Sequence, residues 1–197
     1  MRPRRLAALA ALAAALCLAP AAHAQGQPPA RPGDTTRAAP RPRRSQLGTV
    51  TQWVAGTRVE VLYRRPVARG RELFGALVPW GEMWTPSADS AARLTVSGPV
   101  EVNGAPLAAG TYGVWAIPDS AAWTVVFSET AVAFHTRYPR GRDAVRVRAV
   151  PARGEHVETL SFVFPVVDAD SAVLQLRWGT TVVPLSIRVK AGSGGAR

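Results

Sequence analysis

Arginines and aromatic residues that could bind a ligand are concentrated in one stretch of the chain, residues 63–89. The candidates in this stretch are Tyr63, Arg65, Arg71, Trp80, Trp84 and Asp89. A guanidinium group binds carboxylates and phosphates through paired hydrogen bonds, and aromatic rings bind cations and the apolar faces of sugar rings. The stretch therefore predicts a binding surface for a small polar or saccharide ligand, or for an envelope protein partner.

The same residues also fit a purely structural role, in an interaction module without a ligand. Phe74 and the two tryptophans would then close one end of the core, and the arginines would pair with carboxylates. Arg65 continues the inward-facing row of the preceding strand, so we expect its guanidinium at the rim of the core, where a charge needs a partner. Asp89 is the expected partner, with Glu72 and Glu82 as alternatives.

A third possibility is a hydrolase that acts on envelope material. Glu72, Glu82 and Asp89 could supply the two carboxylates that glycosidases use. The sequence contains no H-E-x-x-H, no G-x-S-x-G, no G-x-G-x-x-G and no phosphate loop. Catalytic residues are therefore unassigned, and a non-catalytic binding module is the favoured function.

The sequence predicts no metal site and no cofactor. His135 and His156 fall in predicted loops, without the three or four clustered ligands that zinc requires, and we expect both on the surface. Asp168 and Asp170 flank one alanine and are expected in a solvated turn, because two carboxylates alone do not make a calcium loop.

Residues 1–24 are expected to be a secretory signal peptide. Arginines at the start precede an apolar stretch from Leu6 to Ala22, and Ala22-His23-Ala24 fits the cleavage site. Cys17, the single cysteine, would leave with this segment, so the mature chain would contain no disulfide. The expected location is the periplasm or the exterior, with no membrane span after cleavage.

Residues 25–45 are expected to be a disordered linker, because they contain five prolines, five arginines and no large apolar residue. Of the net charge of +11, residues 1–45 carry eight arginines against one aspartate, or +7. The remainder is only mildly basic. Nucleic acid is therefore not an expected partner.

Residues 46–190 are expected to form one all-β domain, because apolar residues alternate in short runs cut by Gly, Pro and Asn. We predict an antiparallel β-sandwich of about nine or ten strands, with a distorted β-barrel as the alternative. Asn103-Gly104 and Gly179-Thr180 are expected hairpin turns, and Pro184 is expected at a sheet edge or bulge. Residues 191–197 are expected to be a disordered tail. The expected strands cover 57–65, 93–97, 99–103, 111–117, 123–128, 145–148, 158–166, 172–178 and 181–190.

The stretch 63–89 contains a characteristic series of residues: Tyr63-Arg64-Arg65-Pro66, Gly70-Arg71, Phe74-Gly75, Leu77-Val78-Pro79-Trp80-Gly81 and Trp84. This series resembles the signature of a bacterial domain of unknown function, DUF2911, with the pattern Y-S-R-P-x-x-K-G-R-x-I-F-G-x-L-V-P-Y-G-x-V-W-R-x-G-A-N. The likeness continues through 109–112, 117–118 and Trp123, and so spans most of residues 46–190. Thr85 stands where the pattern has arginine, and Asp89 where it has asparagine. The resemblance implies an exported β-rich domain and brings no catalytic assignment.

Overall fold

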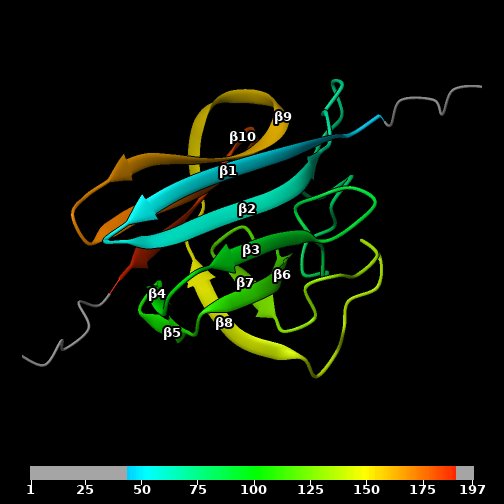
Figure 1. Cartoon of the computed structure of the whole chain (residues 1–197). Coiled ribbons are helices and arrows are strands. Elements are labelled where there is room, and N and C mark those ends of the chain that lie inside the picture. The colour runs from blue at the N-terminus through cyan, green and yellow to red at the C-terminus, as the bar shows by residue number, and fades with distance from the viewer. Residues whose placement is uncertain (1–43, 190–197) are drawn as a thin grey trace, which may run out of the picture. The chain divides into compact units, whose positions relative to one another are not determined.

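The computed structural model describes residues 44–189, which form ten β-strands in two antiparallel sheets (Figure 1). One sheet has six strands in the order β1-β2-β3-β6-β7-β8, and the other has four in the order β5-β4-β10-β9. The predicted signal peptide, most of the linker and the tail lie outside the described residues. The strands are β1 (Gln46–Val54), β2 (Thr57–Arg65), β3 (Ala92–Val96), β4 (Val100–Val102), β5 (Ala105–Leu107), β6 (Gly110–Ile117), β7 (Trp123–Ser128), β8 (Asp143–Ala149), β9 (Ala152–Val167) and β10 (Ser171–Arg188).

The two sheets pack face to face over a common core, which confirms the all-β sandwich and not the barrel. Successive side chains of a strand point to opposite faces of its sheet, so every second side chain faces the core. In β2, Val59, Val61 and Tyr63 are buried, and they share one cluster with Leu160 and Phe162 of β9. The opposite face of β2 carries the half-buried Arg58 and Glu60, which form an ion pair at 2.6 Å. The period-two pattern therefore gives the strand and its buried face correctly.

One predicted hairpin is present and one is not. Asn103 and Gly104 have φ values of 47° and 82° and connect β4 to β5 as expected. Gly179, in contrast, lies inside β10, where the pairing with β9 shifts register on both sides of it. A Cβ on Gly179 would lie 2.8 Å from Cδ1 of Leu73. The glycine is therefore needed for a bulge and a close contact, and the prediction of a turn was wrong.

Pro184 does not make β10 an edge strand, but it lies in a part of β10 that is paired with neither neighbour, away from the register shifts. Strand β10 is flanked by β4 and β9 in the sheet order. Its ladder with β9 runs to Val182, and its ladder with β4 begins at Ile187. Pro184 falls between these two ladders, where its missing N–H interrupts neither of them.

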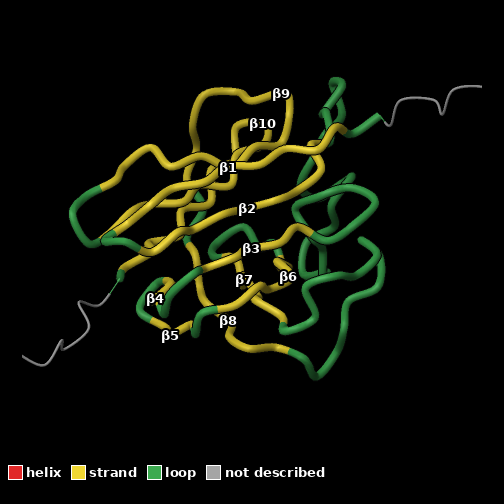
Figure 2. The backbone as a smooth tube through the Cα atoms, viewed as in Figure 1, coloured by secondary structure: helices red, strands yellow, loops and turns green. Residues whose placement is uncertain are grey.

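The long connections collect at one end of the sandwich (Figure 2). Residues 66–91 link β2 to β3, and residues 129–142 link β7 to β8. Backbone hydrogen bonds join the two loops, from the Ala91 amide to the Ala133 carbonyl at 2.9 Å and from the His135 amide to the Asp89 carbonyl at 3.3 Å. Within residues 44–189, the structure contains no helix that could span a bilayer.

Candidate functional site

The chain that follows β2 crosses from the large sheet to the edge of the small one. The Leu160 amide donates to the Pro66 carbonyl at 2.9 Å, and the Ala68 amide donates to the Glu158 carbonyl at 2.8 Å. These bonds fix residues 66–68 along β9. The loop that carries the predicted site residues therefore starts from a rigid anchor.

A tight turn at residues 68–71 places two arginines side by side. Arg69 and Gly70 both have positive φ, 54° and 68°, and the Arg71 amide donates to the Ala68 carbonyl at 3.2 Å. The Arg71 guanidinium closes the turn, with Nε 2.8 Å from the Ala68 carbonyl and Nη2 2.7 Å from that of Val67. Arg71 is therefore oriented by backbone carbonyls and not by the carboxylate that the sequence predicted.

Glu158 holds the strained turn in place from β9. Its Oε1 accepts a hydrogen bond from the Arg69 amide at 2.5 Å, and its Oε2 lies 3.1 Å from Nε2 of His156. The hydrogen bond from His156, and next the one from the Arg69 amide, lower the pKa of Glu158. The ionised carboxylate therefore supports a left-handed arginine, a conformation that costs about 1–2 kcal/mol for a residue with a Cβ.

An aromatic cluster forms the floor beside this turn. Trp84 stacks on Trp178 with centroids 6.1 Å apart and an angle of 9° between the ring planes. Phe74 meets Trp84, Trp123 and Trp178 edge to face, with its centroid 4.9 Å from that of Trp123. Trp123 also meets Trp84 edge to face. This arrangement is the expected aromatic closure of the core, with Trp84 half-buried at its outer side.

Thr85 fixes the chain after Trp84 and has no contact with solvent. Its hydroxyl donates to the Val114 carbonyl at 2.7 Å and accepts from the Ala92 amide at 3.0 Å. At the position where the family pattern has arginine, this chain therefore has a buried structural threonine. Thr85 sets the path of the segment that follows it.

The segment 87–89 returns to the end of β2 and meets the other loop. The Ser87 hydroxyl accepts from the Arg64 amide at 2.9 Å, and Asp89 Oδ2 lies 3.7 Å from Nε of Arg64. Asp89 has a φ of 62°, a left-handed conformation that Asp and Asn tolerate better than most residues. Aspartate at the asparagine position of the family pattern therefore keeps the backbone and adds a negative charge.

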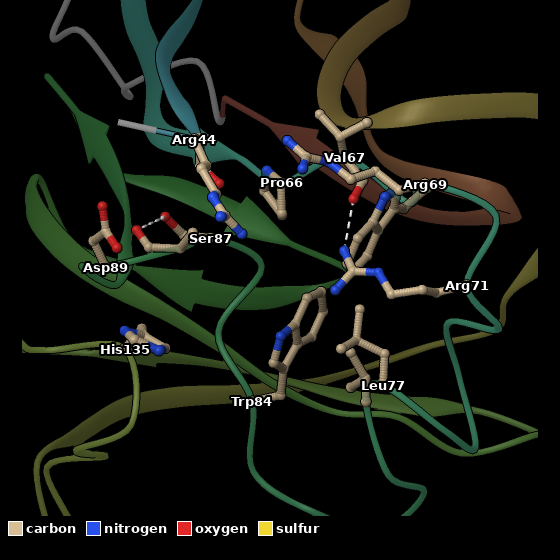
Figure 3. A pocket seen from close by; sticks show the side chains of 14 residues that line it. Arg44, Pro66, Val67, Arg69, Arg71, Leu77, Trp84, Ser87, Asp89 and His135 are labelled. Atoms are coloured by element: carbon tan, nitrogen blue, oxygen red, sulfur yellow. Dashed lines mark hydrogen bonds between the residues drawn. The ribbon is translucent and has the colours of Figure 1, made fainter. Parts of the chain in front are cut away.

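These pieces surround a pocket of about 570 Å³ (Figure 3), here called the arginine pocket. Figure 3 shows Asp89 and His135 on one side, Arg71 and Leu77 on the other, and Trp84 beneath. Three arginines line it against one aspartate, Asp89. The lining is Arg44, Ser45, Pro66, Val67, Arg69, Arg71, Leu77, Val78, Trp84, Ser87, Ala88, Asp89, His135 and Trp178.

Of the six predicted site residues, the structure brings three together. Arg71, Trp84 and Asp89 line the arginine pocket. Tyr63 is only 5% exposed, and its hydroxyl accepts a hydrogen bond from the Phe162 amide at 3.0 Å. Trp80 is 47% exposed and lies outside this pocket. Tyr63 is therefore a core residue, and Trp80 belongs to a different surface.

The expected pair of Arg65 and Asp89 is not formed. Arg65 is half-buried on the inward side of β2, as the alternation predicted, but its Nε donates to the Leu160 carbonyl at 3.3 Å. Its aliphatic stem covers Gly48, where a Cβ would lie 2.7 Å from Arg65 Cδ. The neighbouring Arg64 makes the contact with Asp89. The prediction of the partner was wrong, because a backbone carbonyl of the facing sheet accepts the hydrogen bond from Arg65 and Asp89 contacts Arg64 instead.

Three titratable residues of the pocket, Arg44, Arg69 and His135, were not among the predicted site residues. Arg69 lies in the predicted stretch and was passed over, although Arg-Gly is a turn signal. Arg44 was assigned to the linker. His135 was expected at the surface, but it is half-buried, and its Nδ1 is buried without a hydrogen bond to any residue in 44–189. The loop of His135 contacts Asp89, which is distant in the sequence, so no local sequence pattern predicts this contact.

The carboxylates of the loop are not assembled into a pair. Asp89 lines the arginine pocket, Glu72 lines the neighbouring hollow beyond Arg71 and Trp178, and Glu82 is exposed. Among residues 44–189, no three His, Cys, Asp or Glu side chains lie close enough to hold a metal ion.

The fold and the site thus define a β-sandwich domain with an arginine-lined pocket at its loop end. Residues 45–187 match the family described as "Protein of unknown function (DUF2911)", and the chain belongs to this family. No curated protein and no solved structure matches the chain.

Proposed function

We propose that this domain is a non-catalytic binding module that holds a small anionic ligand in the arginine pocket. The observation that carries the proposal is the charge of the lining. Arg44, Arg69 and Arg71 line the pocket, and no ion pair joins any of them to a carboxylate of residues 44–189. Guanidinium groups without an ion-pair partner can form charge-assisted hydrogen bonds to a carboxylate, phosphate or sulfate.

The remaining lining supports a ligand with a ring or another compact apolar face. Trp84, Leu77 and Pro66 form the apolar part of the wall, and a volume of about 570 Å³ lies in the range of small-ligand sites. Because Trp84 is stacked on Trp178, its indole is fixed before a ligand arrives. A sugar acid or a sugar phosphate combines the required charge and ring.

Binding fits the lining better than hydrolysis. A glycosidase needs two carboxylates across one sugar ring, and the arginine pocket presents Asp89 alone, while Glu72 lines another hollow. On the sequence of residues 1–24, we place the function outside the cytoplasm, in the periplasm or the exterior, where free sugar acids or an envelope protein partner would be available.

Calorimetry on the purified protein tests the proposal with a defined panel. The panel contains glucuronate, galacturonate, glucose 6-phosphate and citrate, each beside a neutral counterpart such as glucose or galactose. We expect at least one anion to bind and its neutral counterpart not to bind. Affinity should fall as salt is raised, because the contacts are ionic.

The control variants separate this pocket from the basic surface in general. Arg44→Gln should weaken anion binding, because it removes one guanidinium from the lining. Arg148→Gln should not, because this exposed residue of β8 does not line the pocket. Equal losses in both variants, or no binding by any anion of the panel, would overturn the proposal.

A further inference from the structure

Trp80 is exposed but packed against its neighbours, and it does not line the arginine pocket. Although 47% of the residue is accessible, its indole lies directly over Gly75, where a Cβ would come 2.5 Å from Trp80 Nε1. Phe74 packs on the ring, with centroids 6.1 Å apart and an angle of 34°. A tryptophan in this position exposes a large apolar face that the domain itself does not cover.

The backbone on each side of Trp80 is also fixed. The Gly75 amide donates to the Val78 carbonyl at 2.9 Å, and the Gly81 amide donates to the Pro118 carbonyl at 2.9 Å. The ring is therefore presented by a loop that is tied at both ends. Since an immobilised side chain loses little entropy when a ligand binds, such a ring is a pre-organised platform.

Hollows of about 270 Å³ and about 460 Å³ lie beside this ring. Four residues line both of them, namely Trp80, Arg153, Thr180 and Thr181. The two hollows are therefore parts of one groove, here called the Trp80 groove. It runs from the turn at Asp119 and Ser120 to the loop residue Glu72.

The Trp80 groove differs from the arginine pocket in its charge. Its two arginines, Arg71 and Arg153, are matched by two carboxylates, Glu72 and Asp119. The side chains of Arg153, Thr180 and Thr181 make no hydrogen bond within residues 44–189, so their polar groups face the groove or solvent. A balanced lining of hydroxyls and charged groups around one aromatic face is the chemistry that recognises a neutral sugar.

From this combination we propose that the Trp80 groove binds a neutral saccharide chain, with one ring stacked on Trp80 and its hydroxyl groups bonded to Thr180, Thr181 and Arg153. A groove made of two adjoining hollows has room for a chain of linked sugars. The groove shares Arg71 and Trp178 with the arginine pocket, but Trp80, Thr180, Thr181 and Arg153, which the proposal uses, do not line that pocket.

Affinity electrophoresis of the purified full chain tests the groove in gels that contain hydroxyethylcellulose, dextran, soluble starch or glycol chitin. We expect at least one of these neutral polysaccharides to retard the protein. Trp80→Ala should weaken the interaction about tenfold or more, because a stacked aromatic contact is lost. Trp80→Tyr, which introduces the residue of the family pattern, should retain most of it.

Trp53→Ala is the matched control, because Trp53 is 60% exposed on β1 and lies outside the groove. It should leave retardation unchanged, as should Arg44→Gln in the arginine pocket. If Trp80→Ala fails to fold, Thr181→Val and Arg153→Gln carry the test, and both should reduce retardation. Retardation in none of the gels, or retardation that survives Trp80→Ala and Thr181→Val, overturns the proposal.

Discussion

Substitution of Arg69 by glycine separates the conformation of this residue from its charge. Arg69 has a φ of 54°, and its guanidinium lines the arginine pocket, while its amide is held by Glu158. Glycine keeps the amide and removes both the left-handed strain and the guanidinium. One change should therefore move stability and affinity in opposite directions.

The expected change in stability is the difference between the relief of backbone strain and the cost of a more flexible unfolded chain. Relief of the left-handed conformation gains about 1–2 kcal/mol, and the greater freedom of glycine in the unfolded chain costs about 0.5–1 kcal/mol. The unfolding free energy of Arg69→Gly should then rise by about 0–1.5 kcal/mol, which corresponds to a Tm higher by about 0–5 °C. Loss of a charge-assisted contact should weaken the best anion of the panel about tenfold to a hundredfold.

Two further variants complete this test, which uses urea unfolding and calorimetry. Arg69→Ala removes the same guanidinium but keeps a Cβ at positive φ, so it should lose affinity without gaining stability. Arg140→Gly also lies before a glycine, but Arg140 is not among the residues with positive φ. It should lose about 0.5–1 kcal/mol and keep its affinity. An Arg69→Gly protein that is less stable than Arg69→Ala, or that binds the anion normally, would refute the reasoning.

Three other changes test separate parts of the account. Asp89→Asn removes the negative charge of the pocket and keeps a residue that tolerates the left-handed backbone. Calorimetry should therefore show anion binding roughly threefold to tenfold tighter. Unchanged affinity would contradict the argument that the charge of Asp89 opposes anion binding. Tyr63→Phe leaves the buried Phe162 amide without its acceptor, so the unfolding free energy measured in urea should fall by about 1–3 kcal/mol. Anion affinity should not change, and a loss of affinity would show that Tyr63 contributes to the binding site. The pKa of Glu158 is lowered on folding, so its stabilising contribution is present above its ordinary value of 4.5 and is lost as the pH falls through the lowered pKa. The Tm difference between the wild type and Glu158→Gln should therefore shrink in acid, and a constant difference would count against the Glu158–Arg69 contact.

Alternation in the sequence was sufficient for most of the sandwich. Buried positions at every second residue identify β2 and the two parts of β10 on either side of Gly179, although the sequence predicted these parts as separate strands. Asn103-Gly104 identifies a turn in which both residues have positive φ. Gly179 shows the limit of such local signals. Its role depends on Leu73, which is distant in the sequence and packs where a Cβ would stand.

The candidate site was predicted only in part, because its parts come from separate elements. The stretch 63–89 contributes Arg71, Trp84 and Asp89, as expected from their chemistry. His135 arrives from the β7–β8 loop, and Arg44 from the start of the domain, through contacts that no periodicity encodes. Arg65 was placed on the correct face but given the wrong partner, since its Nε donates to a carbonyl of β9.

A crystal structure of the protein with the tightest anion of the panel tests the central claim most directly. The account predicts that the acidic group lies within hydrogen-bonding distance of the guanidinium groups of Arg69 and Arg71, with the remainder of the ligand against Trp84. An anion bound to arginines elsewhere on the surface, with the arginine pocket holding only solvent, would contradict the claim.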